Sequence, residues 1–335
     1  MAATLCALSN ELILSILSSL DKANVKSVSL VCSRLYYVAI DAFYSNIEIN
    51  LNDHQHRLSP LKLLLRTLLE HESLRPAVKR FALLGDQCQG DSHHVVGDSA
   101  VLQLTMAQFE QASSAWTIPV KGSNLLLAAL VLAKLPNIQH LELGIKFLTT
   151  SATLGVFLGC RLTDAYGRFY AKPCSTLERL THIVFAPTAD LDCEGRKAKP
   201  VFENQDAYLD WPPDALFAER PIDTLQVLAL FYLPVIRKID ILLPTTARKL
   251  WWPDIRPRTV TLTTLILRST ICGEDTVEDL LRVTPNLKKF SYERFYDPHE
   301  LPKRRLPNPR RLYKALQHVK LTLEELVIMI EVYYW

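Results

Sequence analysis

The side chains that could do chemistry in this sequence are histidines, cysteines and tryptophan–arginine clusters, and their spacing favours no catalytic or metal site. His54 and His56 flank Gln55, and His93 and His94 are adjacent in a polar segment. Either pair could hold a metal ion in principle, but histidines at such spacing in a loop are more often solvated surface. The 7 cysteines include no C-x-x-C pair. We therefore predict no metal ion and no cofactor.

Motifs of nucleotide-binding and hydrolytic enzymes do not occur either. The sequence contains neither of the two glycine-rich phosphate loops, G-x-x-x-x-G-K-[ST] and G-x-G-x-x-G, and it lacks G-x-S-x-G and H-E-x-x-H. A net charge of only +3 gives no reason to expect nucleic acid as a partner. No apolar run approaches the length that spans a bilayer. We expect a protein that is not an enzyme; an enzyme with a cryptic site in the C-terminal part remains a separate hypothesis.

The cysteine usage and the N-terminus indicate a reducing compartment. An odd number of scattered cysteines is typical of free thiols rather than of a disulfide framework. The first residues, MAATLCALSNE, have no basic region, and an acidic residue interrupts them early, so we expect no secretory signal. The expected location is cytoplasmic or nuclear.

Two kinds of segment could recognise another protein. Tryptophan and arginine in polar, proline-bounded loops are typical of interface anchors, and they occur at LDWPP (209–213) and WWPDIRP (251–257). The basic run PKRRLPNPRR (302–311) could bind an acidic or phosphorylated partner or direct nuclear import. The alternatives are tryptophans packed over the edge of a core and a solvated basic loop. The predicted target-binding residues are Trp211, Trp252, Arg256, Arg258, Arg304 and Arg305.

The first fifty residues predict three short amphipathic helices. Ser9 can cap the first helix, a second helix is expected from about Asn24, and a third from Arg34 to about Tyr44. The apolar residues of the first helix form one broad stripe at helical spacing: Leu12, Ile13, Ile16, Leu17 and Leu20. Because so short a segment buries little surface alone, part of this stripe should stay exposed, which usually marks a partner interface.

This stretch resembles an F-box. The resemblance is carried by Leu8, Glu11, Leu12, Ile16, Leu20, Asp21, Leu30, Val31, Cys32, Arg34 and Leu35, while Ser9 stands where the family usually has proline. An ordinary helical hairpin packed on the next domain is the alternative. The resemblance implies binding to a Skp-type adaptor and through it to a cullin. The residues expected to contact the adaptor are Leu8, Glu11, Ile13, Ile16, Leu17, Leu20, Val31 and Leu35.

The rest of the chain predicts strands in a repeating pattern. Alternating polarity predicts a strand at 45–51. A second strand is expected at 78–84, with a helix from Ser59 between the two. Three later segments contain a proline followed by apolar residues, as in LPNIQHLEL (135–143) and TPNLKKFSY (284–292). In each of them the last two apolar residues are separated by one position, and four related segments show this spacing without the proline. The markers of these predicted strands are Leu141, Ile183, Leu228, Ile239, Leu265, Phe290 and Leu326.

The spacing of these strands is similar to that of degenerate leucine-rich repeats. The intervals from Ile239 to Leu265 and from Leu265 to Phe290 are 26 and 25 residues, within the range of that family; a non-repeating α/β domain is the alternative. The predicted fold class is α/β, with a three-helix F-box (1–50) followed by an irregular leucine-rich-repeat-like solenoid of helix–strand units (51–335). A solenoid end needs a polar cap, so the apolar strand before Trp335 should be covered or continued.

Taken together, the sequence resembles the F-box families of filamentous fungi. This resemblance implies substrate selection for a Skp–cullin–F-box ubiquitin ligase. The N-terminal helices would hold the adaptor and the remainder would hold a target protein near the ubiquitin-conjugating enzyme. The protein itself would supply no catalytic group. The alternative function is a non-degradative interaction protein that binds the adaptor but recruits no cullin.

Overall fold

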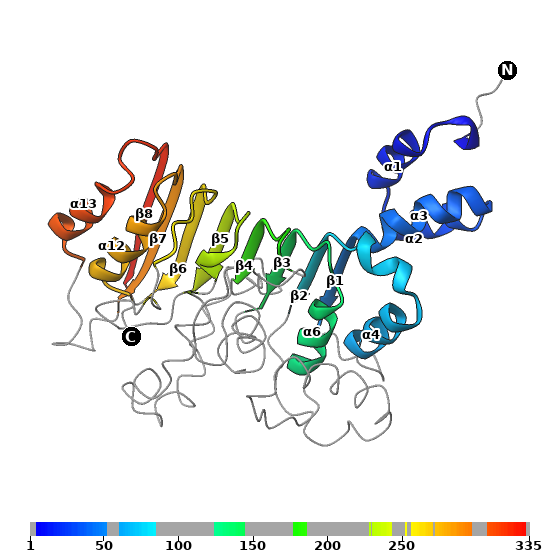
Figure 1. Cartoon of the computed structure of the whole chain (residues 1–335), viewed down its shortest axis with the longest axis horizontal. Helices are drawn as coiled ribbons and strands as arrows, with labels where there is room; N and C mark the ends of the chain where they lie inside the picture. The colour runs from blue at the N-terminus through cyan, green and yellow to red at the C-terminus, as the bar shows by residue number, and fades with distance from the viewer. Residues whose placement is uncertain are drawn as a thin grey trace.

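One parallel β-sheet runs through the part of the chain that the computed structural model describes, which comprises residues 5–51, 60–84, 124–144, 177–185, 228, 230–242, 252, 256–270, 272–296 and 307–332. Its eight strands lie side by side in the order of the sequence (Figure 1), and every neighbouring pair is parallel. The strands are β1 (Asn46–Asn50), β2 (Arg80–Leu84), β3 (His140–Leu143), β4 (His182–Phe185), β5 (Lys238–Leu242), β6 (Thr264–Thr270), β7 (Lys289–Tyr296) and β8 (Glu325–Val332).

The repeated apolar pattern fixes the register of the sheet. Six of the seven predicted strand markers occupy one position across six strands: Leu141, Ile183, Ile239, Leu265, Phe290 and Leu326. The apolar residue two places further along β3 to β7 points to the same side, and nearly all of these side chains are buried. The seventh marker was wrong, because Leu228 is a buried helical residue that precedes η4 (Leu230–Tyr232).

Helices cover the apolar side of the sheet near its two ends. Near β1 lie α4 (Pro60–Glu70), η2 (Glu72–Ala77) and α6 (Asn124–Ala133); near β8 lie α12 (Glu274–Val283) and α13 (Pro309–Leu316) (Figure 1). Both α4 and α13 begin at a proline, which fits the first turn because its missing N–H has no helical partner there. Leu61, Leu65 and Leu68 form the buried face of α4 and join the main core under the sheet.

The fold class predicted from the sequence, an F-box followed by a leucine-rich-repeat-like solenoid of helix–strand units, was wrong. The described residues form one eight-stranded, all-parallel α/β sheet. Among them an α-helix directly precedes β1, β2, β3, β7 and β8, counting α4 with η2 for β2, whereas the described ranges contain no full α-helix that separates β4, β5 or β6 from the strand before it. The physical reason lies in the repeated pattern, which specifies the turn into a strand and the strand's two inward residues. It carries no information about the residues before the proline, so the pattern predicts the strands but cannot predict which elements lie between them.

Three short helices at the N-terminal end have a small core of their own. After η1 (Leu5–Ala7) come α1 (Asn10–Ser18), α2 (Lys22–Ser29) and α3 (Ser33–Ser45), close to the ranges that the apolar spacing predicts. This second core consists of Ile13, Leu17, Val25, Leu35, Val38 and Ala39. Chain continuity joins it to the sheet, because α3 leads directly into β1, and Ile40 and Tyr44 of α3 pack against the main core. The three helices extend beyond β1, at the end of the sheet opposite β8 (Figure 1).

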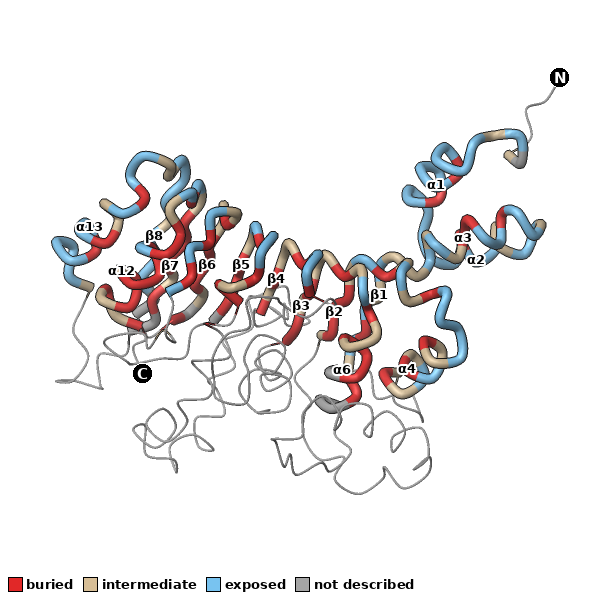
Figure 2. The backbone as a smooth tube through the Cα atoms, in the orientation of Figure 1, coloured by how far each residue is buried: buried red, intermediate tan, exposed pale blue. Residues whose placement is uncertain are grey.

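The other face of the sheet carries most of its charged residues, together with apolar residues such as Ala82, Val184 and Ile266. Burial alternates along β3 and β4 (Figure 2), and residues such as Glu142 of β3 lie between buried neighbours with their side chains on the side away from the core. Charges on this face pair across strands. Arg80 Nη2 donates to Glu142 Oε2 at 2.6 Å, and Lys289 Nζ lies 2.6 Å from Glu325 Oε1. We call this surface the open face.

Candidate partner-binding surface

The N-terminal helices are held in place by local hydrogen bonds at their ends. The Ser9 hydroxyl accepts the N–H of Leu12 at 3.4 Å at the start of α1. The guanidinium of Arg34, in the first turn of α3, donates to the carbonyl oxygen of Leu8 at 2.7 Å and to Oδ1 of Asn10 at 3.1 Å. Satisfying the free groups of helix termini in this way stabilises short helices, and the Arg34 contacts fix the start of α1 against α3.

Helix α1 divides its apolar residues between the core and the solvent. Ile13 and Leu17, four residues apart, are fully buried in the small core. Leu12 and Ile16 repeat the same spacing one position earlier, so they lie about 100° around the helix. Their exposed fractions are 54% and 40%. Leu20 continues this second line just beyond the helix, and we call Leu12, Ile16 and Leu20 the α1 stripe.

A second exposed apolar group lies where α2 turns into α3. Helix α2 ends at Ser29, and the N–H groups of Leu30 and Val31 bond back to Ser27 and Val28, which makes a tight turn. The side chains of Leu30 and Val31 are 78% and 69% exposed, and that of Tyr37 is 71% exposed. We call Leu30, Val31 and Tyr37 the α2–α3 corner.

Helices α1 to α3 with their turns, which we call the small module, expose many large apolar side chains that their own core does not bury. The large exposed apolar residues of α1 to α3 and their turns are Leu12, Leu14, Ile16, Leu20, Leu30, Val31, Tyr36, Tyr37 and Phe43. Full burial of one such aliphatic side chain is worth about 1.5–3 kcal/mol, so a partner that covered several of them would gain substantial binding energy. Polar contact at the margin is available from Glu11, whose pKa is lowered by hydrogen bonds from its own backbone N–H and from Ser9.

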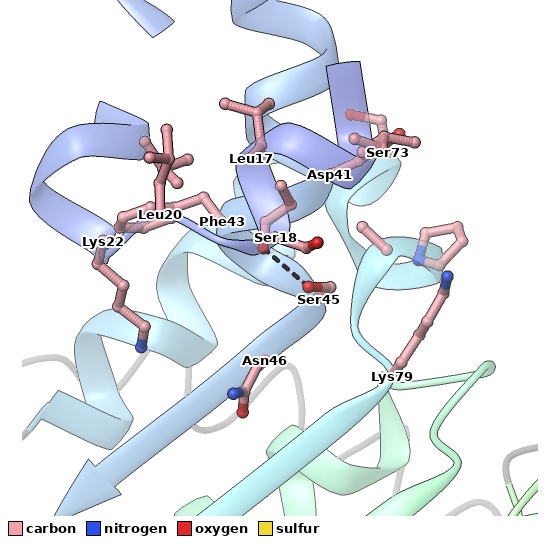
Figure 3. Close-up of a pocket in the computed structure, with 15 residues that line it drawn as sticks. Leu17, Ser18, Leu20, Lys22, Asp41, Phe43, Ser45, Asn46, Ser73 and Lys79 are labelled. Atoms are coloured by element: carbon pink, nitrogen blue, oxygen red, sulfur yellow. Dashed lines mark hydrogen bonds between the residues drawn. The ribbon is translucent and has the colours of Figure 1, made fainter. Parts of the chain in front are cut away.

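An open cleft of about 680 Å³ separates the small module from the first strand. Figure 3 shows that side chains of α1, α3, β1 and η2 line it, among them Leu20 and Phe43 on the module and Ser73 and Lys79 on the sheet side. The hydroxyl of Ser45, where α3 ends, donates to the carbonyl oxygen of Ala42 at 2.7 Å. The cleft therefore lies between the two cores, and the connection beside it is the continuous chain from α3 to β1.

The structure divides the residues that were predicted to contact an adaptor into three groups. Glu11, Ile16, Leu20 and Val31 are exposed, and Leu8 is half-buried against the small core. The remaining three, Ile13, Leu17 and Leu35, are buried core residues. Their side chains can shape the surface only by positioning the helices, so a direct contact falls to the exposed residues.

Sequence reasoning left three prominent exposed residues out of the predicted contact: Leu12, Leu30 and Tyr37. The signal for Leu12 was present in the width of the apolar stripe, which is greater than one helix can turn toward a three-helix core. The exposure of Leu30 depends on where α2 ends, and that boundary cannot be read from apolar spacing alone.

The residues predicted to bind a target have mixed positions. Trp252 is half-buried, with its ring 5.9 Å from that of Phe231 and 6.5 Å from that of Tyr232, so it packs over the edge of the main core. Arg256 and Arg258 are exposed. Trp211, Arg304 and Arg305 lie outside the described residues, as do the histidines at 54, 56, 93 and 94.

Within the described ranges, no group of three or more histidine, cysteine, aspartate or glutamate side chains could hold a metal ion. No described helix combines the length and the apolar character needed to cross a membrane. Comparison with known proteins found no matching family model and no match among curated proteins.

Proposed function

We propose that the protein is the substrate-recognition subunit of a Skp–cullin–F-box ubiquitin ligase. Its N-terminal helices bind a Skp-type adaptor, the adaptor brings the cullin, and the remainder of the chain holds a target protein. Transfer of ubiquitin is then accelerated by proximity, because a target lysine is held near the charged thioester at high local concentration. The protein contributes binding surfaces and no reacting group.

The observation that carries this proposal is a module with its own core that nevertheless exposes two apolar groups, the α1 stripe and the α2–α3 corner. Leu12, Ile16 and Val31 belong to the set of residues through which the segment resembles an F-box, and all three are exposed. A single short module rarely exposes so many large apolar side chains unless a partner covers them. The strand order of the described sheet also never reverses, so these strands lack the switch point at which open α/β sheets commonly bind small ligands.

The test is adaptor capture by the full chain with charges placed on the exposed positions. Changing Ile16→Asp together with Val31→Asp places two carboxylates in a contact that must lose water, at a cost of several kcal/mol. We expect the double variant to lose the adaptor by at least a hundredfold in affinity, measured with a purified Skp-type adaptor. Both positions are exposed, so the fold should survive, which circular dichroism would check.

A matched control is Leu63→Asp, because Leu63 is similarly exposed, at 43%, but belongs to α4 under the sheet. This variant should bind the adaptor as the unchanged protein does. Undiminished capture by a folded Ile16→Asp, Val31→Asp variant would refute the proposed surface. Co-purification of the cullin with the adaptor is expected as well; capture of the adaptor without any cullin would indicate a non-degradative interaction protein.

A further inference from the structure

A row of basic and imidazole side chains crosses the open face of the sheet at the start of four neighbouring strands. Arg80, His140, His182 and Lys238 are paired in register on β2, β3, β4 and β5, so their side chains follow one another at the strand spacing of about 4.8 Å. The rings of the two histidines are stacked, with centroids 4.3 Å apart and planes inclined by 16°. The exposed Arg237 directly precedes Lys238. We call these five residues the histidine row.

The charges that act on the two rings are all positive. Burial, and then the neighbouring Arg80, lower the pKa of His140. Burial, followed by His140, Lys238 and Arg237, lowers the pKa of His182, whose Nδ1 lies 2.8 Å from the hydroxyl of Thr181. Both rings are therefore mostly neutral at neutral pH, and a negative charge placed beside them would favour their protonated form.

The carboxylates closest to the row already have strong partners of their own. Glu142 accepts the 2.6 Å hydrogen bond from Arg80. Asp240 accepts two hydrogen bonds from Arg268, at 2.6 and 2.9 Å, and is only 1% exposed. Past β5 the corresponding positions are Thr264 and then Lys289, which pairs with Glu325. Lys238 Nζ also lies 3.6 Å from Asp240 Oδ2, but that carboxylate is already paired with Arg268. Positive potential therefore remains for a ligand along the stretch from His140 to Lys238 with Arg237.

We propose that the histidine row binds an acidic, extended segment of a partner protein, and that this binding strengthens as the pH falls. The inference deepens the proposed function, on which it rests, by assigning the chemistry of the target. Carboxylates along such a segment match the positive groups of the row. The stacked imidazoles supply further positive charge when binding leads one of them to take up a proton, while their mutual repulsion at a ring separation of 4.3 Å opposes protonation of both.

A protein segment fits this surface better than a nucleic acid does. The next outward-facing positions along the strands, about 6.6 Å further on, include Glu142 on β3 and Asp240 on β5. A broad polyanion lying on the row would face these carboxylates, whereas a single extended peptide can follow the row and stay clear of them. The net charge of the whole chain is also only +3.

The direction of the pH effect follows from linkage. The pKa of each histidine is lowered in the free protein and raised by a bound anion, so the complex holds more protons than the free protein between those two values. Affinity for the anion therefore rises as the pH falls through that interval, by up to about tenfold per pH unit for each histidine that becomes protonated. Glutamate carboxylates of the ligand stay ionised above about pH 5.

The experiment uses the full chain and a fluorescein-labelled peptide of ten glutamates, followed by fluorescence anisotropy at constant ionic strength. We expect binding at least tenfold tighter at pH 6 than at pH 8. The His140→Gln, His182→Gln double variant should lose most of this gain, while His71→Gln, which changes an exposed histidine between α4 and η2 and outside the sheet, should keep it. Arg237→Ala should weaken binding at both pH values.

Several outcomes would overturn the inference: no binding at pH 6, an unchanged pH response in a folded histidine double variant, or tighter binding of a single-stranded or duplex oligonucleotide than of the peptide. Because Arg237 is exposed, its variant remains informative if the histidine variant fails to fold; unchanged affinity of Arg237→Ala would also count against the row. The assay contains no adaptor, so it can fail while the adaptor test succeeds, and the reverse.

Discussion

Asp240 illustrates how single residues in this sheet depend on a partner from the neighbouring strand. Its carboxylate is 1% exposed and accepts both hydrogen bonds of the Arg268 guanidinium, with Lys238 Nζ at 3.6 Å. Removing Arg268 leaves this buried carboxylate with only the longer contact to Lys238, which compensates its charge in part. We expect Arg268→Ala to lower the free energy of unfolding by about 3 kcal/mol, measured by urea denaturation.

The matched control for that prediction is an exposed ion pair. Arg66 and Glu70 lie on the surface of α4 with Nε and Oε1 3.2 Å apart, and exposed pairs contribute little. Arg66→Ala should change stability by less than about 0.5 kcal/mol. Equal effects of Arg66→Ala and Arg268→Ala would show that burial of Asp240 adds nothing to the strength of its pair.

At the level of residues, the sequence predicted which positions of a helix are apolar better than it predicted which of these side chains face the core and which face solvent. Ile13, Leu17 and Ile16 all fall on one broad helical stripe, yet the first two are buried and the third is exposed. Helical spacing locates such residues to within a wide arc, and the partner helices decide which part of that arc becomes the core. The side chain of Trp252 was similarly ambiguous, because a tryptophan between prolines can either anchor a partner or pack over a core edge.

The stability of helix α2 should depend strongly on the cap at its N-terminal end. It has only eight residues, too few to be stable without tertiary support, and a single buried residue, Val25. The carboxylate of Asp21 accepts the backbone N–H of Asn24 at 2.7 Å. We expect Asp21→Ala to destabilise α2 by about 1 kcal/mol, seen as faster amide hydrogen exchange in residues 22–29.

The comparison for Asp21 is Ser9, which caps α1 through a longer contact of 3.4 Å and whose helix buries both Ile13 and Leu17. Ser9→Ala should increase exchange in α1 less than Asp21→Ala does in α2. Unaltered exchange in α2 after Asp21→Ala would mean that packing on α3, and not the cap, holds this helix.

Most of the strands were predictable from short local patterns, for a reason visible in their lengths. Two inward residues and a preceding turn are enough to define a four-residue strand such as β3, and LPNIQHLEL contains all of them. Leu228 satisfied the same apolar spacing without forming a strand, because Leu230 to Tyr232 adopt a 3₁₀ turn beneath Trp252. Pairing with both neighbours completes a parallel strand, and a local pattern contains no information about it.

On the scale of the whole molecule, the two cores differ greatly in size. The small core has six buried residues, whereas the main core extends from Ile49 of β1 to Val319 after α13. Larger cores bury a larger fraction of their surface and are correspondingly more stable. The open face extends along the sheet, whereas the exposed residues of α1 to α3 lie beyond its β1 end (Figure 2). The two surfaces are therefore separate, and one partner could bind at each of them at the same time.

Because the cores are distinct, we expect their stabilities to be separable. Leu17 and Leu265 are both buried leucines, one in each core, and truncation of a buried leucine costs about 2–5 kcal/mol. Leu17→Ala should raise hydrogen exchange in residues 10–45 and leave β3 to β7 unchanged, whereas Leu265→Ala should raise exchange in the sheet. Adaptor binding should protect residues 10–45 in the unchanged protein and restore protection in Leu17→Ala, because a ligand that binds only the folded helices stabilises them. The packing of Ile40 and Tyr44 against the main core sets the limit of this independence: if Leu17→Ala raised exchange equally in β1 to β7, the helices and the sheet would unfold as one unit.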